Sequence, residues 1–157
     1  MKPLPFILAL MLASSAVAAP PPPPPSYVSD ASKILTSPNL EVGKIASLFA
    51  DDVKVYRNGK LIADGRPAWL KLRSAEAERY NGRVLGYSES YGGYSEGGGD
   101  LLVFDTYDTV DRRNLPPTFI ADPRPATRST LYQFGDDRLI HNVRIAEVAG
   151  FLFTRKP

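Results

Sequence analysis

The sequence predicts an α+β fold, a cone-shaped curved antiparallel sheet of about six strands with three N-terminal helices packed on its concave face. Two observations predict this class. Apolar residues before residue 81 recur mainly with the helical period of 3.6, whereas those after residue 82 alternate with the period of two that is typical of strands. Because an amphipathic helix must bury its apolar stripe, helices followed by antiparallel strands are expected to cover one face of the sheet.

The first two helices are expected directly after a run of prolines. In residues 27–35 the apolar side chains fall on one helical face: Tyr27, Val28, Ala31, Ile34 and Leu35. Ser37-Pro38 ends this helix and can begin the next, because proline is tolerated in a first turn. The second helix is expected to be short and to bury Val42, Ile45, Ala46 and Phe49.

A hairpin and a third helix follow. Residues 53–57 alternate as a strand, Asn58-Gly59 is a strong signal for a two-residue turn, and residues 60–63 return. After Asp64-Gly65, residues 66–80 are expected to form the third helix, which tolerates a proline in its first turn. The apolar face of this helix consists of Trp69, Leu70, Leu72 and Ala77.

Four more strands are expected in the second half of the chain. The glycine-rich segment 92–99 is expected to be a flexible turn, and the proline-rich segment 114–126 is expected to be a loop. Gly135-Asp136-Asp137-Arg138 is expected to join the last two strands, since Asp and Gly are favoured in turns. The expected strands are residues 83–91, 100–110, 127–134 and 139–148.

An export signal is expected before the domain. Lys2, an apolar run over 4–12 and small residues over 13–19 follow the order of a cleavable signal peptide. Ala16-Val17-Ala18 places cleavage near Ala18, which predicts a periplasmic or secreted chain. The apolar run is far shorter than the roughly 20 residues of a membrane span, so no membrane insertion is expected after cleavage. The expected division is a signal peptide (1–18), a proline-rich spacer (19–26), one domain (27–150) and a C-terminal tail (151–157).

Composition argues against several kinds of site. The sequence contains no cysteine, which excludes disulfides and thiolate metal ligands, and we expect neither a metal nor a cofactor. The formal net charge is only +2, so nothing indicates a nucleic-acid partner.

Two motifs at opposite ends of the domain resemble one known superfamily. The segment Leu48-Phe49-Ala50-Asp51-Asp52-Val53-Lys54-Val55, between helices, and the segment Arg138-Leu139-Ile140-His141-Asn142-Val143-Arg144 are similar to the nuclear-transport-factor-2-like superfamily. This superfamily includes ketosteroid isomerases, SnoaL-like polyketide cyclases, dehydratases and transport factors. The resemblance implies a pocket between the sheet and the long helices, and often a homodimer that forms through the sheet.

The residues that a ketosteroid isomerase needs are absent at the matching positions. Matching the motifs without gaps places Arg57 where the carboxylate base should lie, Lys33 where a tyrosine should lie, and Thr130 where a protonated aspartate should lie. None of these can perform the required proton transfer. His141 is the only histidine, which also excludes dehydratases that pair two histidines.

The same matching predicts which side chains face the pocket. Pairing Phe134 with Leu139 across the turn places Tyr132 beside His141, and places Arg128 diagonal to Glu147. The residues expected to point inward are Val53, Val55 and Arg57 on the first strand, Arg128, Thr130, Tyr132 and Phe134 on the fifth, and Leu139, His141, Val143, Ile145 and Glu147 on the sixth.

Candidate site residues follow from this inward face. Arg128 and Glu147 form either a structural ion pair or ligand contacts, and Trp69 is either core or a stacking wall. His141 beside Tyr132 is either a hydrogen-bonded core residue or a weak catalytic candidate, since only His has an ordinary pKa suited to proton transfer at neutral pH. The candidate ligand-binding set is Arg57, Trp69, Arg128, Thr130, Tyr132, His141 and Glu147.

Three functions remain open from the sequence. The preferred one is a non-catalytic domain that binds a small apolar or amphiphilic ligand in the cone. Since Arg57 and Arg128 outnumber Glu147 by one charge, that ligand is expected to be an acid. The alternatives are an enzyme of SnoaL-like type that uses His141 with Tyr132, and a structural dimerisation module.

Overall fold

The computed structural model describes residues 23–37, 42–80, 89–95, 98–108, 110 and 125–149. The expected signal peptide and tail, residues 19–22 of the expected spacer, and residues 114–124 of the expected loop lie outside the described residues. No helix within the described ranges is long and apolar enough to cross a membrane. The elements are α1 (Ser26–Leu35), α2 (Val42–Ala46), β1 (Phe49–Arg57), β2 (Lys60–Asp64), α3 (Arg66–Tyr80), β3 (Glu89–Ser95), β4 (Gly98–Asp108), β5 (Pro125–Phe134) and β6 (Ile140–Ala149).

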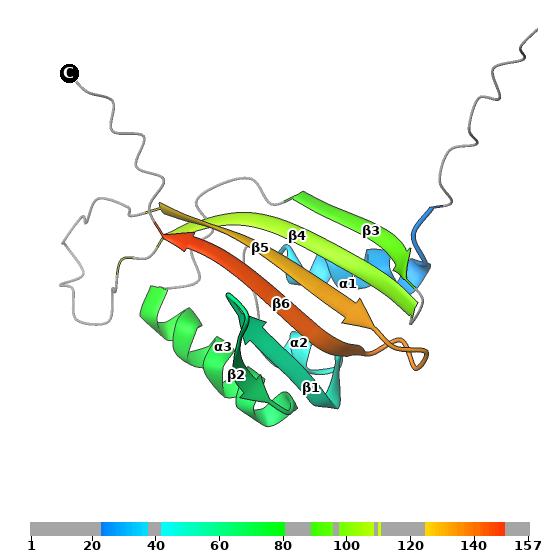
Figure 1. The fold of residues 1–157 in the computed structure, drawn as a ribbon, viewed down its shortest axis with the longest axis horizontal. Helices are drawn as coiled ribbons and strands as arrows, with labels where there is room; N and C mark the ends of the chain where they lie inside the picture. Colours follow the sequence, from blue (N-terminus) through cyan, green and yellow to red (C-terminus); the bar gives the residue numbers. More distant parts are fainter. Residues whose placement is uncertain are drawn as a thin grey trace, which may run out of the picture.

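The six strands form one curved sheet in the order β2-β1-β6-β5-β4-β3 (Figure 1). Four neighbouring pairs are antiparallel, but β1 and β6 run parallel. The predicted α+β class and the curved sheet of six strands are therefore confirmed, and the sheet is antiparallel at every described pair except β1–β6. Parallel neighbours need a long connection, and here the whole domain between β1 and β6 supplies it.

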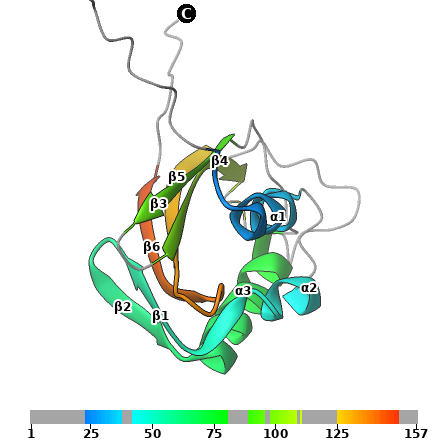
Figure 2. The same cartoon turned by 90° about the vertical axis from the view of Figure 1, so that its right-hand side faces the viewer.

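Helices cover the concave side of this sheet, as predicted (Figure 2). α1 packs on β3 and β4, while α3 packs on β1 and β2; α2 contacts both of these helices. The space between the sheet and the two longer helices is lined by side chains that are at most 9% exposed. This core consists of Val28, Ala31, Ile45, Phe49, Val53, Val55, Ala63, Trp69, Leu101, Val103, Tyr132, Phe134, Ile140, Val143 and Ile145.

The second helix ends earlier than the sequence predicts. Phe49 does not continue α2; it is the first residue of β1. The amide N–H of Ile140 donates to the carbonyl of Leu48 at 2.8 Å, which ties the end of the helical turn to the start of β6. Phe49 is fully buried, with its ring centre 6.2 Å from that of Trp69 and 6.3 Å from that of Tyr132.

The glycine-rich segment 92–99 is not the expected flexible turn, because its described residues extend β3 and β4. Glycine is required there by the close approach of α1. A Cβ on Gly99 would lie 2.4 Å from Cγ2 of Val28, and a Cβ on Gly92 would lie 2.7 Å from Cβ of Pro24. The missing side chains allow the helix to lie directly on the strand backbone.

Candidate functional site

Seven polar side chains meet on the inner face of the cone, and we call them the inner cluster. They come from five elements: β1, α3, β4, β5 and β6. Strand register brings them to one end of the sheet, since Asp105 is the register partner of Arg128, and Arg128 is the partner of Glu147. The members are Arg57, Arg73, Glu76, Asp105, Tyr107, Arg128 and Glu147.

Glu76 on α3 is held by two guanidinium groups. Arg57 donates to its Oε1 atom, and Nη1 of Arg73 donates to Oε2 at 2.8 Å. Burial alone would raise the pKa of Glu76, but Arg73 and Arg57 outweigh burial and hold that pKa below its ordinary value of 4.5. Glu76 is therefore an anion that accepts hydrogen bonds rather than a proton acceptor at neutral pH.

Asp105 on β4 is bound by Arg128 through two parallel hydrogen bonds. Nε of Arg128 donates to Oδ1 at 2.9 Å, and Nη2 donates to Oδ2 at 2.5 Å. The guanidinium carbon also lies 4.8 Å from the ring centre of Tyr107, a cation–π distance. Burial lowers the pKa of Arg128, but the hydrogen bonds to Asp105 outweigh it and raise the pKa above its ordinary value.

Glu147 on β6 is shared by Tyr107 and Arg57. The hydroxyl of Tyr107 donates to its Oε1 atom, and Nε of Arg57 lies 3.4 Å from Oε2. The predicted ion pair between Arg128 and Glu147 was wrong. The two residues are opposite in register, but Asp105, the partner of Arg128 on its other side, takes the guanidinium instead.

The inner cluster is balanced in charge, with three guanidinium groups and three carboxylates. The surplus of one positive charge expected from the sequence was wrong, because Glu76 and Asp105 were not counted. The alternation of β4 could have indicated Asp105, since it has the same parity as the buried Leu101 and Val103. The apolar face of α3 could have indicated Arg73 and Glu76, since they lie four and seven residues after Trp69 and therefore on the same side of the helix.

Two buried donors at this cluster have no acceptor among the described residues. They are Nε of Arg57, which approaches Glu147 without the alignment of a hydrogen bond, and Nε1 of Trp69. Trp69 is 2% exposed, and the guanidinium carbon of Arg73 lies 5.5 Å from its ring centre. Since buried polar groups are almost always paired with protein, water or ligand, these donors indicate where an acceptor could bind.

Tyr132 and Thr130 lie inside the cone, as their strand phase predicts, but the predicted partner of Tyr132 was wrong. Phe134 pairs with Ile140 and not with Leu139 as predicted, and a bulge between Gln133 and Phe134 shifts the register by one more residue, so Tyr132 faces Val143 instead of His141. The bulge leaves His141 as an extra residue on β6, and counting residues across the turn could not reveal it. Burial raises the pKa of Tyr132, which keeps its phenol neutral.

His141 lies at the start of β6, away from the inner cluster. Its Nδ1 atom is 3.0 Å from Oδ1 of Asp52, and its Nε2 atom is 3.0 Å from Oδ1 of Asp137. Partial burial lowers the pKa of His141, but the two carboxylates outweigh it and raise that pKa above 6.5. The side chain is 39% exposed, so the structure does not bring His141 and Tyr132 together as an acid–base pair.

The positions matched to the ketosteroid isomerase residues hold no proton-transfer group. Arg57 is held by Glu76 and Glu147, Thr130 is buried, and Lys33 pairs with Asp30 on the exposed side of α1 at 2.9 Å. Within the part of the chain that the structure describes, no three His, Asp or Glu side chains are grouped as metal ligands.

Three solved structures have a similar fold. A nuclear-transport-factor-2-like protein from Anabaena variabilis is 10% identical, with a TM-score of 0.58 over 80% of this chain and 89% of that chain. A protein of the same family from Streptomyces avermitilis is 9% identical, with a TM-score of 0.54 over 80% of this chain and 97% of that chain. A cystatin-fold protein from Novosphingobium aromaticivorans is 15% identical, with a TM-score of 0.51 over 76% of this chain and 96% of that chain.

These likenesses establish the fold alone, because the identities are so low. The chain has the nuclear-transport-factor-2-like cone fold, which confirms the resemblance inferred from the two sequence motifs. No protein-family model matches the sequence, and neither does any curated protein.

Proposed function

We propose that this chain is a non-catalytic nuclear-transport-factor-2-like domain that binds a small amphiphilic molecule in its cone. One observation carries the proposal: two buried donors, Arg57 Nε and Trp69 Nε1, have no acceptor beside a cluster whose carboxylates are all paired. An unsatisfied buried donor costs about 1–3 kcal/mol, and a ligand oxygen would remove that cost.

The state of the ionisable groups argues against acid–base catalysis. A general base needs a pKa close to the working pH, but Arg73 and Arg57 lower the pKa of Glu76. Asp105 is engaged by both donors of Arg128, and burial raises the pKa of Tyr132. His141, the remaining candidate, lies outside the cone in contact with Asp52 and Asp137.

The charge balance favours a neutral head group over the acid that the sequence predicts. An incoming carboxylate would have to displace Glu76, Asp105 or Glu147 from its guanidinium, whereas a carbonyl or hydroxyl oxygen needs only the free donors. The apolar body of the ligand would lie along Trp69, Tyr132 and Phe134, all at most 9% exposed and part of one apolar cluster.

The proposal is tested with octanamide and octanoate, two probes that differ only in the head group. Native mass spectrometry of the purified protein first detects any co-purified molecule. Calorimetric titration should then show octanamide binding at least as tightly as octanoate. Trp69→Phe keeps an aromatic ring but removes the N–H donor, so it should weaken the binding of octanamide about two- to tenfold. Lys71→Gln, at an exposed position of α3, is the control. Tighter binding of octanoate, or equal affinity in Trp69→Phe, would contradict the proposal.

We further propose that the chain is exported and that the first 18 residues are removed. The order of Lys2, an apolar run and Ala16-Val17-Ala18 supports this. N-terminal sequencing of the mature protein should begin at Ala19 or within one residue of it. A protein that keeps Met1 in a membrane fraction would exclude cleavage.

A homodimer that forms through the convex face of the sheet is also proposed. Phe104 supports it, because this β4 side chain points away from the buried Val103 and Asp105 and is 39% exposed. Sedimentation velocity should report a dimer for the wild type, and Phe104→Asp should shift it to a monomer. A monomer at all concentrations of the wild type would refute this part of the proposal.

A further inference from the structure

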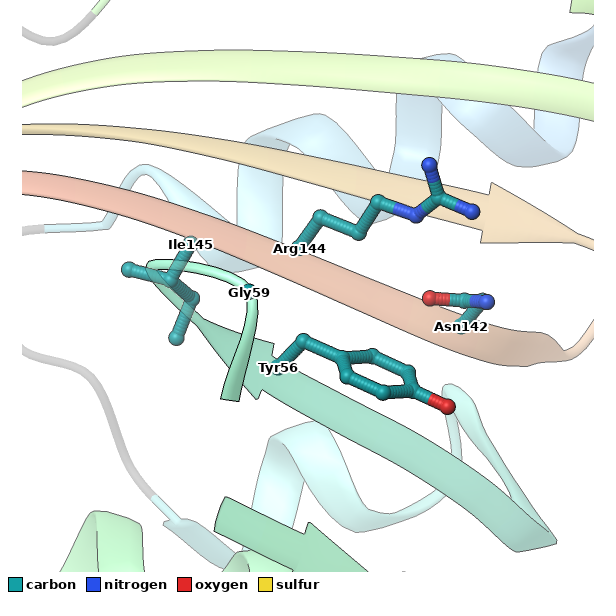
Figure 3. Close-up of a pocket in the computed structure, with 5 residues that line it drawn as sticks. All are labelled: Tyr56, Gly59, Asn142, Arg144 and Ile145. Atoms are coloured by element: carbon teal, nitrogen blue, oxygen red, sulfur yellow. The ribbon is translucent and has the colours of Figure 1, made fainter. Parts of the chain in front are cut away.

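A second recess lies on the outer face of the sheet, opposite to the cone. It has a volume of about 270 Å³ and lies where β1, β6 and the β1–β2 turn meet. Its lining residues are Tyr56, Gly59, Asn142, Arg144 and Ile145 (Figure 3). Nothing in the inner cluster contributes to this outer pocket.

The turn that forms one wall of the outer pocket is fastened to β6. The N–H of Asn58 donates to the carbonyl of Ile145 at 2.8 Å, and the N–H of Glu147 donates to Oδ1 of Asn58 at 3.0 Å. Asn58 and Gly59 have positive φ angles of 48° and 80°, as a tight hairpin turn requires. The wall is therefore built by the fold rather than by a loose loop.

Strand phase brings the polar side chains of the pocket together. Val55, Val143 and Ile145 point into the core, so Tyr56, Asn142 and Arg144 point outward. Tyr56 and Arg144 are register partners on the parallel strands, and Asn142 lies two residues before Arg144. Figure 3 shows the amide of Asn142 between the phenol of Tyr56 and the guanidinium of Arg144.

Two groups of the pocket have no partner among the residues that the structure describes. Oδ1 of Asn142 is buried and accepts no hydrogen bond. Arg144 is exposed, and no ion pair joins it to a carboxylate of the described residues. Arg57 and Arg128, by contrast, are each bound to a carboxylate on the inner face. The outer pocket thus offers the guanidinium of Arg144, which can pair with an anion, and beside it Oδ1 of Asn142, which can accept a hydrogen bond.

We propose that the outer pocket binds a small carboxylic acid that carries a hydroxyl or amino group next to its carboxylate. The carboxylate would pair with Arg144, whose planar guanidinium matches it with two hydrogen bonds. The neighbouring hydroxyl or amino group would donate to Oδ1 of Asn142. The apolar body would lie on the ring of Tyr56 and on its register partner Leu61, which is 44% exposed. The volume suits a ligand of about a dozen non-hydrogen atoms, since drug-sized pockets begin at about 300 Å³.

Three probes of nearly equal size separate the two contacts. Mandelate carries both the carboxylate and the hydroxyl, phenylacetate lacks the hydroxyl, and mandelamide lacks the charge. In a titration followed by ¹H–¹⁵N NMR, mandelate should shift the amide signals of Tyr56, Gly59 and Arg144 in a saturable way. Phenylacetate should bind about two- to tenfold more weakly, because it cannot donate to Asn142. Mandelamide should bind at least tenfold more weakly than mandelate, because it cannot form an ion pair with Arg144.

Variants assign these losses to the pocket. Arg144→Gln should reduce mandelate affinity to that of mandelamide in the wild type, and Asn142→Leu should abolish the preference for mandelate over phenylacetate. Lys71→Gln removes the same charge on α3 and should leave both affinities unchanged. Trp69→Phe should also leave the affinity for mandelate unchanged. Failure of the proposed binding in the cone can therefore be told apart from failure of the proposed binding in the outer pocket.

Three results would overturn the proposal: equal binding of mandelate and phenylacetate, unchanged binding in Arg144→Gln, or amide signals of the pocket that do not move at 20 mM mandelate. Hydrogen exchange adds a fourth test. Protection of residues 56–59 and 142–145 that disappears on dilution would show that a second copy of the chain, and not a small acid, covers the pocket.

Discussion

His141 and Asp52 join the start of β6 to the middle of β1: Nδ1 of the imidazole lies 3.0 Å from a carboxylate oxygen 89 positions earlier in the chain. On the other side of the ring, Nε2 lies 3.0 Å from Oδ1 of Asp137 in the β5–β6 turn. A neutral imidazole has one N–H and can donate to only one carboxylate, whereas the imidazolium donates to both. The bridge between β1 and the turn is therefore complete only when His141 is charged.

We predict that this bridge makes stability depend on pH above pH 6.5. Partial burial lowers the pKa of His141, but Asp137 and Asp52 outweigh it and raise the folded-state pKa above 6.5. The stabilisation is therefore fully present below pH 6.5 and is lost as the pH rises through the folded-state pKa. Urea unfolding from pH 5.5 to pH 9 should show wild-type stability falling over this window, while His141→Gln should vary less.

The same ring gives an independent readout, because His141 is the only histidine of the chain. Its ring protons should titrate in ¹H NMR with a pKa above 6.5. A value at or below 6.5, or parallel pH curves for the wild type and His141→Gln, would show that the carboxylates do not stabilise the charged ring.

Gly135→Ala should disturb the position of His141. A Cβ at residue 135 would lie 2.8 Å from Cδ2 of the imidazole, which is too close for a carbon contact. Since the ring is partly exposed and can move, the cost is expected at the low end for overpacking, about 1 kcal/mol. The NMR pKa of His141 should fall towards 6.5.

Gly43→Ala is the matched control for this change. It adds the same methyl group where no atom lies within 4 Å of the new Cβ, inside α2, and should be neutral or slightly stabilising. An unchanged His141 pKa in Gly135→Ala would indicate that the turn moves instead of the ring.

The packing of α1 on the sheet is tested at Gly99. An alanine there would place its Cβ 2.4 Å from Cγ2 of Val28, so the helix must move away from β4. Thermal or urea unfolding should show a loss of about 1–3 kcal/mol. Gly93→Ala, in the adjacent strand β3, meets nothing within 4 Å and should change stability by less than about 0.5 kcal/mol. Similar losses in the two variants would mean that strand glycines matter for backbone freedom and not for helix docking.

Much of the fold could be predicted, because hydrophobic periodicity and turn-forming residues are read from short stretches of the sequence. The Asn58-Gly59 hairpin, the extent of α3 and the inward phase of Tyr132 and Thr130 are confirmed. The prediction of a flexible turn at 92–99 was wrong, because glycine was taken as a sign of freedom. In the structure Gly92 and Gly99 are needed for the close approach of Val28 on α1, a contact with a helix that ends more than 55 residues earlier in the sequence.

The candidate site was harder to predict, because it depends on register and on pairs between elements. A turn that is one residue longer than expected and a bulge before Phe134 together shift β6 by two residues, which moves His141 away from Tyr132 and gives Val143 its place. The partners of Arg128 and Arg57 come from β4 and α3, and a local sequence pattern does not show which side chains of different elements pair. The residue types on the inner face were therefore partly predictable, whereas their pairing was not.

Asp105 and Arg128 should prove mutually dependent, since their side chains are only 10% and 14% exposed. Asp105→Asn leaves a buried guanidinium without its carboxylate and should destabilise the protein by about 3–5 kcal/mol. Arg128→Gln should cost a similar amount, because it leaves the buried carboxylate of Asp105 without its guanidinium. The double variant removes both charges and should cost clearly less than the sum of the two, with a coupling of about 1–3 kcal/mol.

Urea unfolding of the wild type, the two single variants and the double variant at pH 7 measures this coupling. Asp136→Asn, at an exposed turn position, removes the same charge from the surface and should change stability by less than about 0.5 kcal/mol. Additive losses would show that each charge is solvated independently and that the inner cluster is not a closed ion-pair network. A large coupling would show that Asp105 is committed to Arg128 and is therefore not a group that an incoming ligand can use, in contrast to the unpaired donors of Arg57 and Trp69.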